Sequence, residues 1–156
     1  MFGFLKRKVR EIKAPVDGEI VAIESVEDEV FSKKLVGDGV AIIPVGDVFT
    51  APIDGTVSKI FSTNHAYSIK SKKDLEVMVH IGLDTVDLNG AGFKRLVKEG
   101  AEVKAGDAII GVDLQALKEH AKDIITPIII TDNSDVKKLE KKLTIVKDGD
   151  LIMEVS

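Results

Sequence analysis

Cysteine and tryptophan are absent from this chain of 156 residues, and its aromatic residues are one tyrosine and six phenylalanines. Without cysteine the chain forms neither a disulfide nor a thiolate metal site, and it has no cysteine nucleophile. Nucleic-acid binding favours basic surfaces and rings that stack on bases, whereas this chain has a net charge of −4 and few rings. We therefore expect no nucleic-acid partner.

Long hydrophobic runs are missing as well. The longest apolar stretches, such as residues 124–130, are far shorter than the roughly 20 residues needed to cross a bilayer. Residues 1–13 mix apolar and basic side chains, without the apolar core or cleavage site of a signal peptide. We expect a cytoplasmic protein in which residues 1–12 form a short flexible segment. Residues 1–13 could make a peripheral contact with an anionic membrane surface.

Glycine is frequent, and four of the thirteen glycines precede aspartate, between short runs rich in valine and isoleucine. The motif A-P-V-D-G-E-I-V begins at Ala14 and is echoed by A-P-I-D-G-T-V from Ala51. In each motif proline stiffens the approach, and Asp-Gly makes a turn before a strand. We predict an all-β fold, an antiparallel β-sandwich or flattened barrel with pseudo-symmetric hairpin repeats, as a single domain at residues 13–156. A short helix is predicted at residues 113–122, with a helical turn at 93–100 and a last helix or turn at 134–142.

Two of the three histidines lie within two β-prone runs, residues 65–70 and 75–81, that flank a polar break. This pattern predicts an antiparallel hairpin. A turn centred on the break places His65 directly opposite His80 on one face of the sheet. Such a pair can hold a metal, relay a proton, or provide a nucleophile and a supporting group. Mutual repulsion keeps at least one ring neutral near pH 7.

Two other functional classes share part of this pattern. A zinc-dependent hydrolase using His65 and His80 needs a third ligand, which a carboxylate would have to supply because His120 is remote in sequence. A lipoyl-like or biotinyl-like carrier shares the A-P-x-x-G strands, and Lys72 and Lys73 lie at the predicted hairpin tip. The lysine motifs of those carriers are absent from the tip.

The most specific motif is L-E-V-M-V-H-I-G-L-D-T-V from Leu75, with N-H-A-Y-S-I upstream and L-N-G-A-G-F downstream. It resembles the glucose-type enzyme IIA of the bacterial phosphoenolpyruvate:sugar phosphotransferase system. The similarity extends through V-F-S-K-K-L-V-G-D-G-V-A-I from Val30 and T-P-I-I-I from Thr126. It covers nearly all of the chain after residue 12. Where the family has glycine before the second strand of the hairpin, this chain has Asp74, which tolerates left-handed backbone, so we expect the turn to persist.

The resemblance implies a phosphocarrier. In the family, the residue matching His80 takes a phosphoryl group from the phosphohistidine of the carrier protein HPr and passes it to a cysteine on the IIB domain of a sugar transporter. His65 then stabilises the transferred group, and Thr63 orients His65. No cofactor is required, although His65 and His80 could supply two ligands to a zinc ion at a partner interface. Some relatives also bind regulated permeases or kinases, so such partners are a further expectation.

The resemblance also implies a docking patch around the histidines. Asp28 matches an acidic residue of the family that meets an arginine of the partner. Asp84 could hold the second nitrogen of an imidazole, but the family favours pairing with an arginine. Its apolar members by resemblance are Val30, Phe31 and Val36, to which we add Phe61, Met78 and Val86. Several of these six side chains could instead belong to the core. A small patch with an acidic rim suits transient binding to basic partners.

Overall fold

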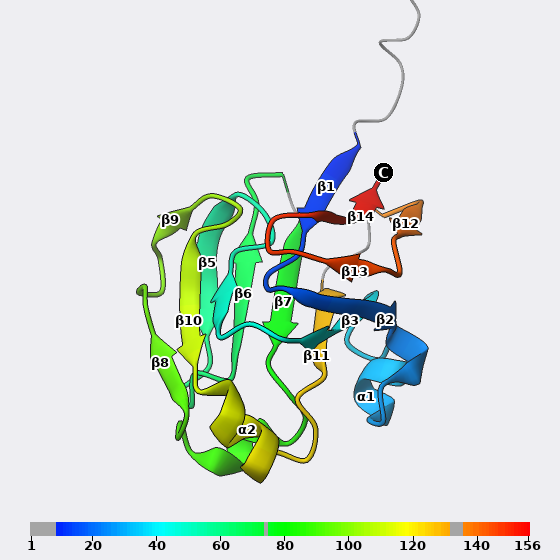
Figure 1. The fold of residues 1–156 in the computed structure, drawn as a ribbon. Helices are drawn as coiled ribbons and strands as arrows, with labels where there is room; N and C mark the ends of the chain where they lie inside the picture. The colour runs from blue at the N-terminus through cyan, green and yellow to red at the C-terminus, as the bar shows by residue number, and fades with distance from the viewer. Residues whose placement is uncertain (1–8, 74, 132–135) are drawn as a thin grey trace, which may run out of the picture.

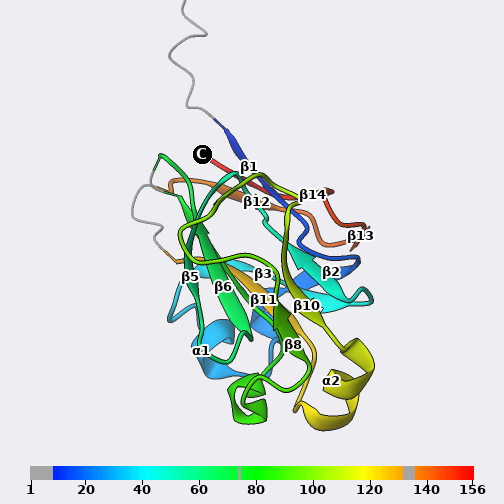
Figure 2. The same ribbon diagram turned by 90° about the vertical axis from the view of Figure 1, so that its left-hand side faces the viewer.

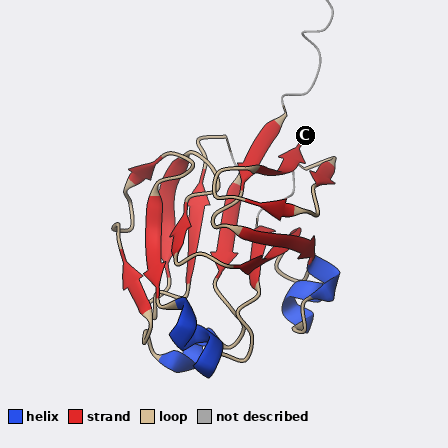
Figure 3. Ribbon diagram, in the orientation of Figure 1, coloured by secondary structure: helices blue, strands red, loops and turns tan. Residues whose placement is uncertain are grey.

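The computed structural model describes residues 9–73, 75–131 and 136–156, and strands dominate it (Figures 1 and 3). Of the flexible segment expected at residues 1–12, residues 1–8 lie outside the described residues, as does Asp74, whereas residues 10–12 belong to the first strand and Ile12 is buried. The strands are β1 (Arg10–Lys13), β2 (Gly18–Ala22), β3 (Asp38–Pro44), β4 (Val48–Thr50), β5 (Gly55–Ile60), β6 (Ala66–Lys70), β7 (Glu76–His80), β8 (Phe93–Arg95), β9 (Glu102–Val103), β10 (Ala108–Val112), β11 (Thr126–Ile130), β12 (Leu139–Lys141), β13 (Ile145–Val146) and β14 (Leu151–Val155). The helices are α1 (Glu29–Ser32), α2 (Leu114–His120) and the 3-10 turns η2 (Ile23–Ser25) and η3 (Thr85–Leu88). Within the described ranges, neither helix is long and apolar enough to cross a membrane.

The strands pair in three antiparallel sheets. The largest has the order β13-β2-β3-β11-β7-β6-β5-β9, and the two small sheets have the orders β1-β14-β12 and β4-β10-β8. Two views at right angles show both helices at the periphery of the strands (Figures 1 and 2). The predicted all-β antiparallel class is confirmed. The sheets are open, and no sheet formed by the described strands closes into a barrel.

The two A-P-x-D-G motifs occupy equivalent places and bond to each other. The N–H of Lys13 donates to the carbonyl of Pro52, and the N–H of Thr50 donates to the carbonyl of Pro15, both at 2.8 Å. The equivalence extends to the sheets, because β13-β2-β3-β11 on one side of the large sheet mirrors β9-β5-β6-β7 on the other. The predicted pseudo-symmetric hairpin repeats are therefore present.

Each motif ends on a glycine that begins a strand, Gly18 in β2 and Gly55 in β5. A Cβ atom on Gly18 would lie 2.3 Å from the carbonyl oxygen of Ile43, and one on Gly55 would lie 2.3 Å from that of Lys70. Real Cβ atoms do not approach so closely, so the neighbouring strand requires glycine at both positions. The repeated Asp-Gly pair thus marks a packing contact as well as a turn.

The main core lies on one face of the large sheet. Alternate residues of β7, Val77 and Val79, point into it, and they are joined there by buried residues of the small sheets such as Phe49 and Ile110. Met78, between the two valines, points to the opposite face. That face therefore has its own, smaller apolar cluster.

The smaller cluster supports η2 and α1 on the outer face of the sheet. Its buried members are Ile23, Val26, Phe31, Ala41, Leu83, Ile125 and Ile129. A helix as short as α1 is not stable by its own propensity, so packing on this cluster holds it in place. The cluster thereby brings α1 next to β7, which ends at His80.

The helical turn predicted at residues 93–100 is wrong, and so is the last helix or turn predicted at 134–142 over its described residues, 136–142. β8 and β12 lie there instead, each an edge strand of three residues in a small sheet. Pairing with β10 and β14 decides these conformations, which the local sequence does not reveal. The predicted helix at 113–122 is confirmed as α2, and the side chain of Asp113 caps it by accepting from the N–H of Ala116.

We predict that Tyr67→Phe destabilises the fold. The Tyr67 ring is fully buried, and its hydroxyl donates to the carbonyl of Thr50 at 2.6 Å, which joins β6 to β4. Removing the hydroxyl leaves a buried acceptor unpaired, at a cost of about 1–3 kcal/mol in the free energy of unfolding. Urea unfolding measures the change. Thr144→Ala, at an exposed residue between β12 and β13, is the control and should stay within about 0.5 kcal/mol of the wild type. Equal midpoints for Tyr67→Phe and the wild type would contradict this account.

Candidate functional site

The hairpin of β6 and β7 brings the two histidines together, but not in the predicted register. The predicted pairing of His65 with His80 is wrong, because Ala66 lies opposite His80. The turn consists of the five residues 71–75, so its centre is shifted from the predicted one. In a regular strand, a register change of one residue would send the His65 ring to the other face of the sheet.

His65 avoids that outcome because it precedes β6 and is not part of the regular strand. Asn64 has a left-handed backbone with φ of 60°, and its N–H bonds to the carbonyl of Phe61 at 2.7 Å, which closes a tight loop. After this loop, the carbonyl of His65 accepts from the N–H of Ile81 at 2.7 Å. The ring faces His80, with the ring centroids 5.0 Å apart and the ring planes at 79°. The two imidazoles are therefore neighbours, as the sequence predicts, by a different backbone path.

His80 is held through a backbone group that the sequence analysis missed. Its Nδ1 lies 2.8 Å from the carbonyl oxygen of Gly82. A carbonyl only accepts, so Nδ1 carries the proton and the lone pair of the neutral ring lies on Nε2. Gly82 has φ of 77°, and a Cβ atom there would lie 2.6 Å from the Thr85 side chain. The glycine of the H-I-G motif is the sequence signal of this left-handed backbone conformation.

His65 lies deeper than His80. Its residue is 4% exposed, and its Nδ1 hydrogen-bonds to the hydroxyl of Thr63. The edge of the Phe61 ring contacts the imidazole, with centroids 5.3 Å apart. Thr63 therefore contacts the ring that the resemblance assigns to it. The loop before β6 brings the side chains of Thr63 and His65 together.

Burial sets the protonation of both rings. It lowers the pKa of His65 from 6.5 to about 4, with a smaller effect from the neighbouring His80. Burial also lowers the pKa of His80, although the Gly82 carbonyl and the carboxylates of Asp28 and Asp84 act in the opposite direction. Both imidazoles are thus predominantly neutral at pH 7, and His80 presents its free Nε2 lone pair.

The acidic residues Asp28 and Asp84 lie at the rim of the histidine pair. Asp28 caps α1 by accepting from the N–H of Val30 at 3.0 Å and is partly exposed. Asp84 is exposed, adopts a left-handed backbone with φ of 57°, and lies 4.0 Å from the ammonium group of Lys122. An ion pair this long between exposed groups is weak, so a basic partner can compete with Lys122 for Asp84.

The apolar residues expected to form the docking patch differ in exposure. Val30, Val36 and Val86 are exposed, whereas Phe61 and Met78 are half-buried. Phe31 is buried at 5% exposure and packs its ring against His80, with centroids 5.1 Å apart. Its ring therefore belongs to the wall of the site. Leu35, 69% exposed after α1, was left out of the expected patch, although its apolar character beside Val36 was a signal.

The site holds few metal ligands. Within the described ranges, no group of three or more histidine, cysteine, aspartate and glutamate side chains lies close enough to bind a metal ion. His65 and His80 offer at most two imidazole nitrogens, and a structural or catalytic zinc normally has three or four protein ligands.

We predict a stability that depends on His65 in acid. Its pKa is about 4 in the folded protein and about 6.5 when unfolded, so the unfolded state binds more protons. The free energy of unfolding should decrease as the pH falls from about 6.5 through 4. In His65→Gln this decrease should be smaller. Urea unfolding at a series of pH values measures it, with the exposed His120→Gln as the control. A slope that is identical in wild type and His65→Gln would contradict the assignment.

Comparisons with known proteins agree with this arrangement. The family described as phosphoenolpyruvate-dependent sugar phosphotransferase system, EIIA 1, matches residues 10–136. The chain is 46% identical over 155 residues to a PTS system glucose-specific EIIA component of Haemophilus influenzae, covering 98% of this chain and 93% of that protein. It is 50% identical over 145 residues to the component of that name from Buchnera aphidicola subsp. Baizongia pistaciae, covering 93% and 86%.

A longer relative and a solved structure extend the comparison. The chain is 44% identical over 133 residues to a PTS system N-acetylglucosamine-specific EIICBA component of Klebsiella pneumoniae, covering 85% of this chain and 20% of that protein. The structure of glucose permease IIA from Mycoplasma capricolum superimposes with a TM-score of 0.92 at 41% identity, over 99% of both chains. The chain belongs to the EIIA family of the phosphoenolpyruvate-dependent sugar phosphotransferase system, whose members are phosphotransferase components that carry the phosphoryl group on a histidine.

Proposed function

We propose that His80 accepts a phosphoryl group from the phosphohistidine of HPr and passes it to a cysteine on the IIB domain of a glucose-type sugar transporter. The observation that carries this proposal is the hydrogen bond from Nδ1 of His80 to Gly82, which leaves Nε2 as a lone-pair nitrogen. The names of the relatives, which include a fused EIICBA component, support a sugar permease as the acceptor. The protein would act in the cytoplasm.

The transfer to His80 needs no metal or cofactor. The Nε2 lone pair attacks phosphorus, the bond from phosphorus to the HPr imidazole breaks, and the electron pair returns to that imidazole. In such a transfer the protein mainly positions the reacting groups and stabilises charge on the phosphoryl oxygens. The lowered pKa of His80 keeps the nucleophile in its reactive, unprotonated form.

His65 would stabilise the phosphoryl group. When the Thr63 hydroxyl donates to Nδ1 of His65, the proton of the neutral ring lies on Nε2, which can donate to a phosphoryl oxygen. The ring centroid lies 5.0 Å from that of His80, a spacing that leaves the oxygens of a bound phosphoryl group within reach. Burial keeps the His65 ring neutral. The ring would therefore act on the phosphoryl group as a neutral hydrogen-bond donor.

Partners would dock on the apolar residues around the histidines. Val30, Val36 and Val86 offer exposed apolar surface, and Asp28 and Asp84 offer acidic groups at its rim. Opposite charges at the rim raise the rate of encounter with basic partners, while a small interface allows each partner to leave. Regulated permeases or kinases would use the same surface. The membrane contact expected for residues 1–13 stays a prediction.

The alternative functions have less support. The zinc-dependent hydrolase needs a third ligand, and the described residues place no such group beside His65 and His80. A partner's carboxylate could complete an interfacial zinc site with the two imidazoles, which is an addition to the phosphocarrier function. For the lipoyl-like or biotinyl-like carrier, an unmodified intact mass after expression with the ligase is the expected result.

Incubation with phosphoenolpyruvate, enzyme I and HPr tests the function. The wild type should gain one phosphoryl group that is labile in acid and stable in base, and His80→Ala should gain none, because its nucleophile is gone. Intact mass and phosphorus NMR report the outcome. Phosphorylation of His80→Ala would show that another residue is the acceptor. A wild type that stays unmodified would rule out the proposed function.

His65→Gln separates the two halves of the transfer. This variant should still accept the group from HPr, but it should donate to IIB at least about a hundredfold more slowly, because a flexible amide replaces the fixed imidazole N–H that stabilises the leaving phosphoryl group. Single-turnover transfer to purified IIB measures the rate, and His120→Gln is the matched control. Normal donation by His65→Gln would remove His65 from the mechanism.

A further inference from the structure

Arg95, the last residue of β8, holds the loop of residues 61–65, which we call the His65 loop. Its Nε donates to Oδ1 of Asn64 at 3.0 Å, and its Nη2 donates to the carbonyl of Phe61 at 3.4 Å. Asn64 is the left-handed residue that turns the chain toward His65. One guanidinium group therefore braces both sides of the tight turn that positions the His65 ring.

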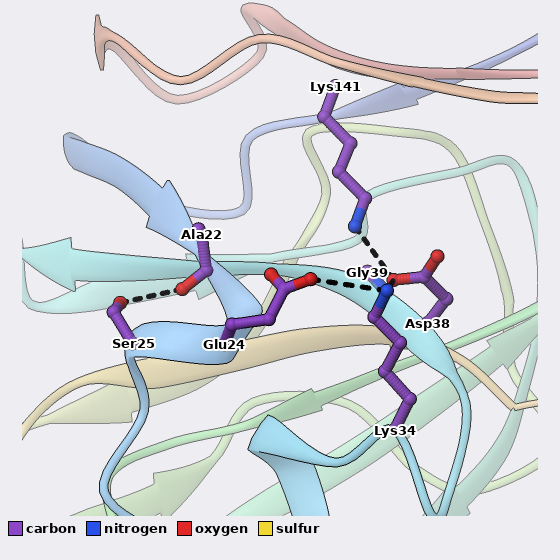
Figure 4. Close-up of polar contacts among 7 residues, drawn as sticks. All are labelled: Ala22, Glu24, Ser25, Lys34, Asp38, Gly39 and Lys141. Carbon is purple, nitrogen blue, oxygen red and sulfur yellow. Dashed lines mark hydrogen bonds and ion pairs between the residues drawn. The ribbon is translucent and has the colours of Figure 1, made fainter.

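Lys141, the last residue of β12, holds residues 23–38, which we call the α1 segment. Its ammonium group lies 2.7 Å from Oδ1 of Asp38, which also accepts from the N–H of Gly39 at 2.7 Å. Lys34 lies between two carboxylates, 3.2 Å from Glu24 and 3.7 Å from Asp38. Figure 4 shows Lys34 and Lys141 meeting at Asp38 from different elements.

The contacts around Asp38 form an ionised network. Partial burial acts to raise the pKa of Asp38, but the hydrogen bonds from Lys141 and Gly39 outweigh it and hold the pKa below its usual value. Through Lys34, the network joins the two ends of the α1 segment, Asp38 at one end and Glu24 in η2 at the other. Between these ends the segment carries Asp28 and Phe31, and the Phe31 ring packs on His80. The α1 segment thus connects Lys141, along the chain, with the ring that packs on His80.

Arg95 and Lys141 occupy the same position in the two halves of the fold. Arg95 pairs with Ile110, the third residue of β10, and Lys141 pairs with Met153, the third residue of β14. β10 and β14 are the central strands of the two equivalent small sheets. Each cation reaches from its small sheet to the start of an equivalent strand of the large sheet, β6 for the His65 loop and β3 for Asp38.

We propose that Arg95 and Lys141 are pseudo-equivalent positioning residues for phosphoryl transfer, Arg95 for the His65 loop and Lys141 for the α1 segment. The proposal rests on the proposed function, because it assigns each cation to one part of that transfer. Arg95 acts through the hydrogen-bond donor His65, and Lys141 acts through Phe31 and the docking residues of α1. Neither cation needs to touch the phosphoryl group.

The two cations act on different steps. The His65 loop bears on stabilisation of the phosphoryl group, so its displacement should slow donation. The α1 segment bears on docking, so its displacement should raise the KM for HPr. A purely structural contribution would instead lower the stability and change both steps alike, which gives the proposal a distinct signature.

The experiment uses the full chain with Arg95→Gln and Lys141→Gln. The matched controls are Lys94→Gln and Lys142→Gln, because each removes one positive charge from an exposed residue adjacent to the cation tested. Nitrogen-15 NMR of the imidazoles reports the tautomer and titration of His65 and His80 without any phosphoryl donor. Steady-state phosphorylation by HPr and single-turnover donation to IIB report the two transfer steps.

Arg95→Gln should slow donation about tenfold and shift the His65 imidazole signals, with the KM for HPr unchanged. Lys141→Gln should raise the KM for HPr about tenfold with the His65 signals unchanged. Both controls should stay within about twofold of the wild type. Test variants that match their controls in NMR and in both rates would overturn the proposal, as would equal losses in both steps for both variants.

Asn64→Gly is a second variant that tests the role of Arg95 even if Arg95→Gln folds poorly. Glycine keeps the left-handed backbone of Asn64 but removes the amide that Arg95 contacts. Asn64→Gly should slow donation like Arg95→Gln, and the double variant should lose no more than either one. Fully additive losses would separate Arg95 from the His65 loop and overturn that half of the proposal.

The outcomes distinguish this proposal from the proposed function. If HPr fails to phosphorylate the wild type, the proposed function is ruled out. The His65 signals of Arg95→Gln and the His80 signals of Lys141→Gln, which should shift because Phe31 packs on the His80 ring, still decide whether the two cations position the rings. If HPr phosphorylates the wild type on His80 while Arg95→Gln and Lys141→Gln behave like their controls, the positioning role falls and the function stands.

Discussion

The hydrogen bond from His80 Nδ1 to the Gly82 carbonyl is the interaction on which the site depends. It assigns the proton to Nδ1 and leaves a lone pair on Nε2, the nitrogen that we propose as the nucleophile. This geometry requires the left-handed conformation of Gly82, where any Cβ atom would meet the Thr85 side chain. Burial then keeps the ring unprotonated near neutral pH. A single backbone carbonyl thus decides which nitrogen of His80 carries the free lone pair, and burial and the neighbouring carboxylates set the pKa of the ring.

Two imidazoles in one site have separate roles because their surroundings differ. His65 is almost fully buried and bonded to the Thr63 hydroxyl, whereas His80 is half-buried and near the carboxylates of Asp28 and Asp84. The strong lowering of the pKa of His65 prevents two adjacent positive charges over the physiological pH range. The deeper ring is therefore suited to donate a hydrogen bond, and the shallower ring is suited to exchange a group with another protein.

The duplicated fold explains how a small domain holds such a site. The two halves share the A-P-x-D-G turns, the small sheets and the mirrored order of the large sheet. They differ in the connection before the equivalent strands β3 and β6. One half has the short His65 loop, and the other has the longer α1 segment, which supplies Phe31 and the docking residues. Function therefore resides where the repeats diverge, while the shared framework fixes the distance between the two segments.

The sequence by itself determined the antiparallel all-β class, the repeated turns at Ala14 and Ala51, the cap of α2 at Asp113 and the closeness of the two histidine rings. These features depend on local chemistry, such as the fixed φ of proline, the Asp-Gly turn and the alternation of apolar residues. Only the tertiary structure decided the register of β6 and β7, the carbonyl that holds His80, the burial of Phe31 and the strands β8 and β12. Each of these depends on contacts between segments far apart in the chain or on a left-handed residue such as Asn64, and a local pattern does not encode which distant partner a strand or loop will meet.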